Sequence, residues 1–333
     1  MNKMVHVLAA GMLVAASVFA EEAKCAAGCC AKGAAGCWAM QRGGAFWVGV
    51  CDKNGAKASI LWGGGSPTVQ YDVAIDGQKA VMKQLVHGDN DPEKKRERVS
   101  TLTADGDKGE LVCEITDGNG KVHQTEKFGL KRIPPPGPKP DLAALKFGEP
   151  VDLLKDGLDG WKSMNPNAHF GWTVKDGVLS NRIKRNAEGK PEGGNANLMT
   201  KRADFTDFKL DYEVRVLPGC NSGVYLRGLY ELQVIDSYGK GPDCHNMAAV
   251  YGRITPKVAA EKPANEWQTV NAVLANRHIT VRLNGQLIID NEPVFGCTGG
   301  AITSDEFVPG PMYLQGDHSD ADFRNMILTP IVK

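Results

Sequence analysis

The stretch Asn221-Ser-Gly-Val-Tyr-Leu-Arg-Gly-Leu-Tyr-Glu-Leu-Gln-Val-Ile-Asp236 decides the fold of the C-terminal half of the chain. Two short runs of alternating residues flank its central Gly-Leu pair, which predicts a tight antiparallel hairpin. Because successive side chains of a strand point to opposite faces of a sheet, Arg227, Glu231 and Gln233 are expected on one polar face. Charged groups in the middle of a strand are costly to bury, so this face is a candidate for ligand recognition.

Further alternating runs continue on both sides of this hairpin. The readable strands of the C-terminal part are residues 172–174, 178–181, 197–200, 208–216, 223–227, 230–236, 248–251, 267–275, 278–283, 286–290, 310–315 and 321–329. Asn284-Gly285, between two of these runs, is the strongest hairpin signal of the chain. So many short two-faced strands do not pack in one flat sheet, and residues 147–333 are therefore predicted to form a two-sheet sandwich.

The N-terminal part shows the same alternation in a smaller unit. Its runs are residues 46–51, 58–62, 69–75, 99–102, 110–115 and 121–130. Residues 43–132 are predicted to form a small antiparallel β domain, in which no catalytic set is recognisable. Residues 133–146 are rich in proline, which cannot donate to a sheet ladder, so they are predicted to be the linker. The predicted fold class of the whole chain is all-β.

The first twenty residues have the pattern of a secretory signal peptide. Lys3 supplies the positive charge, residues 5–19 are mostly apolar, and small residues precede the expected cleavage after Ala20. The mature chain is therefore expected to be exported, to the periplasm or beyond, without a transmembrane segment. Lys plus Arg and Asp plus Glu are equal at 39 each, so neither nucleic acid nor an anionic membrane is indicated as a partner. The oligomeric state is left open.

Residues 21–42 form a Cys-, Ala- and Gly-rich segment. Its apolar content is too small to order it, so a flexible tether is expected, with local disulfides or a thiolate metal site as alternatives. Its cysteines, Cys25, Cys29, Cys30 and Cys37, match no standard zinc spacing. Cys220 and Cys244 flank the central hairpin, and in an exported protein they form either a disulfide or two free thiols.

Ten short motifs of the C-terminal part stand in a recognisable order. They are Leu154–Trp161, Trp172–Leu179, Phe205–Leu210, Asn221–Arg227, Tyr230–Asp236, Ala249–Gly252, Glu266-Trp267, Leu283–Gly285, Leu314-Gln315 with His318, and Phe323–Met326. In this order they resemble the 3-keto-disaccharide hydrolase family, formerly a domain of unknown function. The resemblance implies a concanavalin A-like or laminin-G-like jelly-roll sandwich. The sequence departs from the family after Trp267, where Gln-Thr-Val precedes Asn271, and at the two residues between Gln315 and His318.

The resemblance also implies a site on the concave face of one sheet. The catalytic residues that it implies are Glu231, His318 and Asp236, and the substrate-binding residues are Asn221, Arg227, Gln233, Tyr251, Gln315 and Arg324. The implied substrate is an oxidised carbohydrate, a 3-keto-glycoside. No cofactor is required by this reading, and a divalent metal ion is an option.

The implied chemistry differs from ordinary glycoside hydrolysis. A ketone at C3 makes the hydrogen on C2 acidic, so a base removes it, C1 expels its leaving group, and water adds back. Such a site needs a base, a group that stabilises the enolate, and an acid near the leaving oxygen. Glu231 or His318 is the expected base, Arg227 or a divalent cation stabilises the enolate, and Asp236 or Tyr251 lies near the leaving group. The rival is a direct mechanism with Glu231 and Asp236 as a carboxylate pair.

Each of these residues also has a structural interpretation. Arg227 and Glu231 are equally able to form a cross-strand ion pair, and Asp236 can cap a turn. The acidic loop around His318 can be simply solvated, and Arg324 can tie the last strand to its sheet. The alternative function is a non-catalytic carbohydrate-binding module on the same sandwich.

Overall fold

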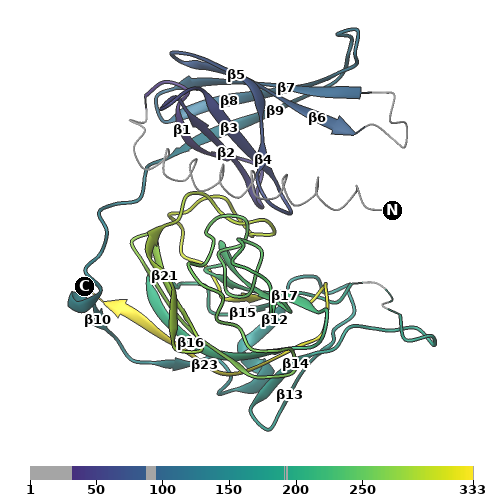
Figure 1. Cartoon of the computed structure of the whole chain (residues 1–333), viewed down its shortest axis with the longest axis vertical. Helices are drawn as coiled ribbons and strands as arrows, with labels where there is room; N and C mark the ends of the chain where they lie inside the picture. The colour runs from purple at the N-terminus through teal and green to yellow at the C-terminus, as the bar shows by residue number, and fades with distance from the viewer. Residues whose placement is uncertain (1–31, 88–94, 191, 193, 333) are drawn as a thin grey trace. The chain divides into compact units, whose positions relative to one another are not determined.

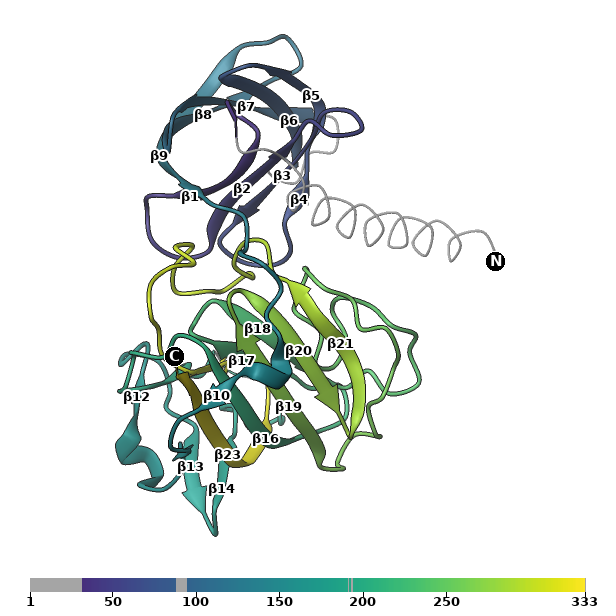
Figure 2. The ribbon, with the colours of Figure 1, turned by 90° about the vertical axis from the view of Figure 1, so that its left-hand side faces the viewer.

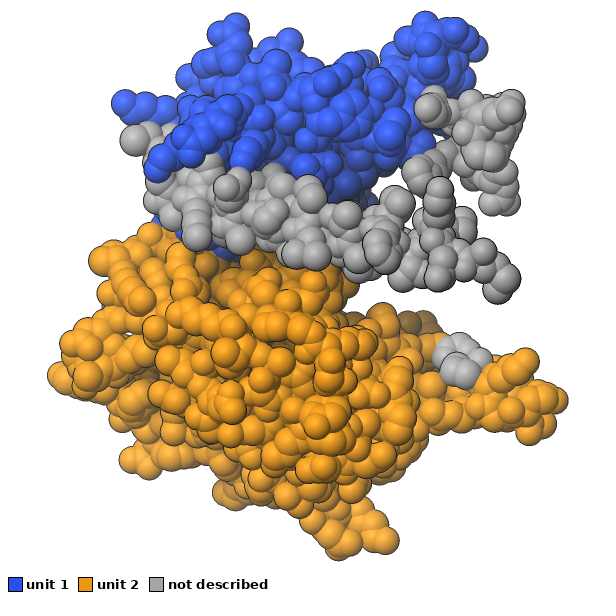
Figure 3. Space-filling model, in the orientation of Figure 1, with its two compact units in different colours: residues 1–135, 295–306 blue, residues 136–294, 307–333 orange. Residues whose placement is uncertain are grey.

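The computed structural model describes residues 32–87, 95–190, 192 and 194–332. The predicted signal peptide and Cys25, Cys29 and Cys30 lie outside these residues. The chain divides into two compact units (Figure 3), unit 1 with residues 1–135 and 295–306 and unit 2 with residues 136–294 and 307–333. Among the described residues, no helix has the length and apolar character that crossing a membrane requires.

Unit 1 is one nine-stranded antiparallel sheet, visible in Figure 2. Its strands are β1 (Gly36–Met40), β2 (Phe46–Cys51), β3 (Lys57–Trp62), β4 (Thr68–Val69), β5 (Tyr71–Asp76), β6 (Lys79–His87), β7 (Lys95–Asp105), β8 (Lys108–Thr116) and β9 (Val122–Ile133). They follow the order β4-β3-β2-β1-β9-β8-β7-β6-β5. Alternate residues such as Val48, Ile60 and Leu111 are fully buried in one core. The period-2 pattern therefore predicted this unit correctly as antiparallel β structure.

Strand β1 lies within residues 21–42, for which the composition predicted a flexible segment. Arg132 orders this part of the chain, because its guanidinium donates to the carbonyls of Ala35, at 2.8 Å, and Gly33, at 2.5 Å. The same guanidinium lies 3.9 Å from the centre of the Trp38 ring. Cys37 of this strand is buried. The low hydrophobicity of this segment thus did not prevent residues 36–40 from forming a strand. The stabilising contacts come from Arg132 of β9, which is nearly a hundred residues away in the chain.

Residues 295–306 belong to unit 1 although they follow a strand of unit 2. Lys131 forms an ion pair with Asp305 at 2.7 Å, and the Gly300 amide donates to the Gly63 carbonyl at 2.7 Å. These residues fall within the predicted sandwich domain, 147–333, because no change of composition marks them.

Unit 2 is a sandwich of two antiparallel sheets (Figures 1 and 2). The nine-stranded sheet has the order β13-β14-β23-β16-β19-β20-β21, with β10 and β11 paired to β23, and the five-stranded sheet has the order β12-β15-β22-β17-β18. Its elements are η1 (Leu142–Ala144), β10 (Lys146–Phe147), β11 (Val151–Asp152), η2 (Gly157–Gly160), β12 (Trp161–Ser163), β13 (Trp172–Lys175), β14 (Val178–Asn181), β15 (Leu198–Thr200), β16 (Phe208–Val216), β17 (Asn221–Leu226), β18 (Tyr230–Ile235), β19 (Gln268–Ala275), β20 (His278–Leu283), β21 (Gln286–Pro293), β22 (Tyr313–Leu314) and β23 (Ala321–Val332). The all-β prediction is confirmed.

Two hairpin turns show how the sequence controls this sandwich. Asn284 and Gly285 join β20 to β21 with φ angles of 50° and 82°, as the Asn-Gly signal predicted. In the hairpin β17–β18 the left-handed residues are Arg227 and Gly228, with φ of 57° and 64°, and Leu229 donates its amide to the Leu226 carbonyl at 3.0 Å. The predicted Gly-Leu turn is therefore one residue out of position, because the favoured hairpin turn needs two consecutive left-handed residues.

The nine-stranded sheet contains a buried carboxylate, Asp322 of β23. Arg182 contacts it at 2.7 Å and Arg215 at 2.8 Å. Burial alone would raise the pKa of Asp322, but hydrogen bonds from Ser180 and the two arginines outweigh it, and the pKa is lowered. A depressed carboxyl pKa stabilises the fold above the unfolded-state pKa, and this stabilisation is lost as the pH falls through the folded-state pKa.

Asp322→Asn is expected to lower the free energy of unfolding by about 2 kcal/mol at pH 7, since it removes the charge that both arginines contact. Urea unfolding at pH 7 measures the difference. The gap between parent and variant should shrink below pH 3.8, where the parent carboxyl takes up its proton. If the parent and Asp322→Asn had equal urea midpoints at pH 7, the ion pairs of Asp322 with the two arginines would contribute no stability.

Candidate active site

One row of the five-stranded sheet brings three polar side chains together. Tyr225 of β17 pairs with Glu231 of β18 on one side and with Tyr313 of β22 on the other, so the three lie on the same face. The next residues along these strands, such as Leu232 and Leu314, point the other way and are fully buried in the sandwich core. The face with Glu231 is therefore the polar face of this sheet, which points away from that core and is itself buried at these three residues.

The side chains of this row are held in contact. The Tyr225 hydroxyl donates to Oε2 of Glu231 at 2.8 Å. The rings of Tyr225 and Tyr313 stack with centroids 4.1 Å apart and an angle of 12° between their planes. Asn197, just before β15, donates its amide to the Tyr313 hydroxyl at 3.2 Å. The Glu231 carboxyl is thus positioned by a continuous polar and aromatic row.

Gly223 supplies the space for this carboxyl. It lies in β17 opposite Gln233, two residue pairs from Tyr225–Glu231 and therefore on the same face. A Cβ atom at Gly223 would lie only 2.3 Å from Oε1 of Glu231. Since carbon and oxygen do not approach that closely without a bond, Glu231 can occupy its position only above a glycine.

Burial changes the acidity of Glu231. Its side chain is 4% exposed, and loss of water raises its pKa to about 8. The Tyr225 hydrogen bond and the positive charge of His318 act in the opposite direction, while the negative charge of Asp317 adds to the increase. A carboxyl that titrates near pH 8 is suited to take up and release a proton at neutral pH.

Asp317 and His318 form a second titratable pair beside this face. His318 Nδ1 and Asp317 Oδ1 are 2.6 Å apart, and this hydrogen bond raises the pKa of His318. Burial would raise the pKa of Asp317, but the His318 contact lowers it. Asn197 holds this loop, because its Oδ1 accepts from the amides of Gly316, at 2.7 Å, and Asp317, at 3.2 Å. Asp317 therefore favours the protonated form of His318, whose positive charge acts on Glu231.

The structure separates Asp236 and Arg227 from this cluster. Asp236 follows β18 and accepts from the Gly219 amide at 3.0 Å, the turn-capping role that was its structural alternative. It is five residues from Glu231, which corresponds to roughly 16 Å of extended strand and to the opposite face. Arg227 occupies the hairpin turn, where its Nη2 donates to the Val308 carbonyl at 2.5 Å.

The remaining predicted residues lie along or beside the same sheet. Gln233 is buried two residues from Glu231 along β18, with its Oε1 accepting from the Val234 amide at 2.9 Å. The backbone N–H of Gln315 donates to the Gly223 carbonyl at 2.9 Å, and the side-chain Oε1 of Gln315 is buried without a partner among the described residues. Tyr251 donates its amide to the Glu231 carbonyl at 3.0 Å. The predicted strand 248–251 is replaced here by isolated bridges.

Asn221 and Arg324 have other surroundings. The backbone of Asn221 is bonded in both directions to the Ser319 hydroxyl, which ties the start of β17 to the loop after His318. Arg324 lies on β23 of the nine-stranded sheet, where it contacts Glu213 and lies 4.1 Å from the centre of the Trp267 ring. This is the structural interpretation of Arg324, the tie between the last strand and its sheet.

Sequence reasoning missed five contributors to the site, Tyr225, Gly223, Tyr313, Asn197 and Asp317. The first two belong to the hairpin of Glu231 itself, and the other three come from segments far from it in the chain. One signal was present, because Gly223 interrupts an otherwise bulky strand, and such a glycine indicates a close approach. Within the described residues, the side chains that could share a metal ion are Asp243, Cys244 and His245, and Glu231 and His318 are not among them.

A β-sandwich that holds a buried carboxyl with a pKa raised to about 8, near a histidine whose pKa is also raised, carries groups of the kind that acid–base chemistry uses. The particular family is defined by sequence. The chain belongs to the 3-keto-α-glucoside-1,2-lyase-like domain family, whose model matches residues 150–329, more than half of the chain. This membership places the protein among those that act on glycosides.

Solved structures of similar chains are distant in sequence. A candidate glycosyl hydrolase from Parabacteroides distasonis is 22% identical, covers 54% of this chain and 98% of its own, and has a TM-score of 0.40. A second candidate glycosyl hydrolase from the same organism is 19% identical, with coverages of 54% and 94% and a TM-score of 0.42. A carbohydrate-binding module from Bacillus subtilis is 12% identical, with coverages of 50% and 93% and a TM-score of 0.33. A comparison with curated proteins found no match.

Proposed function

We propose that this protein is an exported enzyme that cleaves 3-keto-glycosides by removing the proton on C2 and eliminating the group on C1. The observation that supports it most is Glu231, a carboxyl that is buried, bonded to Tyr225 and titrates at about pH 8. The family match supports the substrate class. Export rests on the signal-peptide pattern of the first twenty residues.

The reaction begins with Glu231 as the base. Its carboxylate takes the proton on C2, and the electron pair of that bond forms an enolate with the oxygen on C3. When the enolate collapses, the C3 carbonyl re-forms, C1 and C2 become doubly bonded, and the bond from C1 to the leaving oxygen breaks. The imidazolium of His318 gives its proton to the departing oxygen. Water added across the new double bond completes a net hydrolysis.

We base the other proposed roles on the side chains of the polar face. His318 acts as the acid, because its hydrogen bond to Asp317 raises its pKa and so favours the protonated form. Gln233 lies two residues from Glu231 along β18, and Gln315 is bonded through its backbone to Gly223, the residue opposite Gln233, so their side-chain amides are candidates to bind the C3 oxygen as charge develops there. Arg227 and Asp236, engaged in turns at the two ends of the hairpin, have no direct role in this scheme.

The direct mechanism with two carboxylates fits less well. A retaining or inverting pair needs carboxyl groups about 5 to 10 Å apart across one sugar bond. Glu231 and Asp236 are five residues apart on an extended strand, roughly 16 Å, and point to opposite faces. This geometry favours elimination.

Asp317→Asn is expected to shift the pH profile of kcat/KM to lower pH. In the parent, activity rises as Glu231 loses its proton near pH 8 and falls as His318 loses its own. The negative charge of Asp317 raises the pKa values of both Glu231 and His318, so its removal should shift both the rise and the fall of the profile to lower pH. Asp290→Asn, which removes an exposed carboxylate that pairs with Lys257, should leave the profile unchanged. An unshifted profile in Asp317→Asn would contradict the assigned roles.

The function is tested with 3-keto-trehalose beside trehalose. The enzyme should cleave the keto-sugar and leave trehalose intact, and a substrate deuterated at C2 should react more slowly. Cleavage of trehalose alone would overturn the keto-glycoside proposal. Cleavage of the keto-sugar without an isotope effect or exchange at C2 would favour direct hydrolysis. Binding of the sugar without turnover would show a carbohydrate-binding module.

A further inference from the structure

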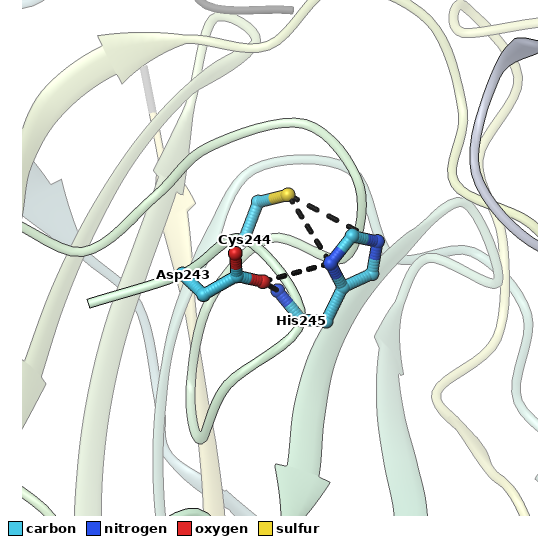
Figure 4. Close-up of side chains that lie close together, drawn as sticks. All are labelled: Asp243, Cys244 and His245. Atoms are coloured by element: carbon cyan, nitrogen blue, oxygen red, sulfur yellow. Dashed lines mark hydrogen bonds and ion pairs between the residues drawn. The ribbon is translucent and has the colours of Figure 1, made fainter. Parts of the chain in front are cut away.

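Three potential metal ligands lie together in the loop between β18 and β19. They are Asp243, Cys244 and His245, whose ligand atoms all lie within 4.8 Å of one another. Figure 4 shows the three side chains turned toward one another. The backbone forms this arrangement because Oδ1 of Asp243 accepts from the His245 amide at 2.8 Å, a turn that brings consecutive side chains to the same side.

The distances suit a tetrahedral ion. At ordinary zinc bond lengths, sulfur, nitrogen and oxygen ligands are about 3.4 to 3.6 Å apart. Cys244 Sγ and His245 Nδ1 are 3.5 Å apart, which matches. His245 Nδ1 and Asp243 Oδ1 are closer, at 2.8 Å, so the carboxylate must move outward by about half an ångström. Its side chain is 37% exposed and has room to do so.

We propose that Asp243, Cys244 and His245 bind one zinc-class divalent ion, with water as the fourth ligand. The donor set of one thiolate, one imidazole and one carboxylate favours zinc or cobalt over calcium or magnesium, which prefer oxygen ligands. Cys244 is buried, whereas the His245 side chain is 44% exposed. The fourth position therefore faces solvent on the His245 side.

The loop that carries this site lies against the strand of Glu231. The ring of His245 meets the ring of Tyr251 edge to face, with centroids 5.1 Å apart, and the Tyr251 amide donates to the Glu231 carbonyl. The Gly252 amide donates to the Cys244 carbonyl at 3.0 Å, which closes the loop into a short ring. A bound ion would fix the loop beside β18. The metal site stands independently of the proposed reaction.

Titration of the metal-free full-length chain with Co²⁺ tests this site. Cobalt bound by Cys244 should produce a thiolate charge-transfer band in the near ultraviolet and the strong visible bands of four-coordinate cobalt. Cys244→Ser should lose the charge-transfer band. His245→Gln, at a half-exposed position that the fold tolerates, should weaken Co²⁺ binding at least about tenfold. Cys220→Ser is the matched control, since Cys220 is also a free cysteine, and should keep both bands.

Two results would overturn the proposal. A charge-transfer band that persists unchanged in Cys244→Ser would place the metal on other cysteines. Parental Co²⁺ affinity in His245→Gln would exclude the imidazole as a ligand. Turnover of 3-keto-trehalose is measured separately, so loss of the metal site and failure of the proposed reaction are distinguishable.

Discussion

Glu231→Gln should lower kcat/KM for a 3-keto-glycoside by about 10³- to 10⁴-fold, the range that a positioned general base contributes. The amide cannot accept the proton from C2. Its carbonyl oxygen can still accept the hydrogen bond that Tyr225 donates to the parent carboxyl at 2.8 Å, so the row of side chains is preserved. Steady-state kinetics with 3-keto-trehalose measure the loss.

The same variant should be more stable than the parent at alkaline pH. The pKa of Glu231 is raised from 4.5 to about 8 in the folded state, so ionisation of the carboxyl opposes folding increasingly as the pH rises between these values. Gln carries no charge and avoids this cost, which amounts to a few kcal/mol at pH 9. Lower activity with higher alkaline stability distinguishes loss of a base from damage to the fold.

Glu213→Gln is the matched control. Glu213 lies on β16 of the other sheet and contacts Arg324, so the same chemical change should leave kcat/KM within about twofold. If Glu231→Gln kept more than a tenth of the parental activity, Glu231 would not be the base. His318 would then be the next candidate, since its imidazole is the other titratable group of the pair.

Alternation along β18 was sufficient to place Glu231 and Gln233 on one face, because a strand has a period of two and this strand has no bulge in its pairing with β17. The same reasoning failed for Arg227. The turn lies one residue earlier than predicted, so Arg227 is in the turn and not in the strand. The position of a turn depends on φ angles, which the sequence Arg-Gly-Leu does not determine.

The pKa of Glu231 had no sequence signal. It depends on burial and on Asp317 and His318, which reach the sheet through β22, a strand of two residues. The alternation of side chains did contain a signal for Asp236. Residues five apart on a strand point to opposite faces, so the pattern places Asp236 on the face opposite Glu231. Asp236 was nevertheless grouped with Glu231 because the family resemblance, and not the pattern, suggested it.

Gly223→Ala should lower kcat by about 10- to 100-fold while leaving the protein folded. The added Cβ would lie 2.3 Å from Oε1 of Glu231, so the carboxyl must retreat by about 1 Å. Misplacement of a catalytic group by this amount costs on the order of a hundredfold in rate. Gly160→Ala is the control, because its Cβ would meet only the Leu153 carbonyl at 3.9 Å, an ordinary contact.

Shortening the carboxyl side chain should relieve the collision. Glu231→Asp withdraws the carboxyl by one methylene, so adding Gly223→Ala to Glu231→Asp should cost less than adding it to the parent. A double-mutant cycle on kcat/KM measures this coupling, which is expected because the two residues are in contact. If the two effects were additive, Gly223→Ala would act through the strand backbone and not through Glu231. Coupling would instead show that the absence of a side chain at Gly223 allows Glu231 to occupy the position in which it acts as the base.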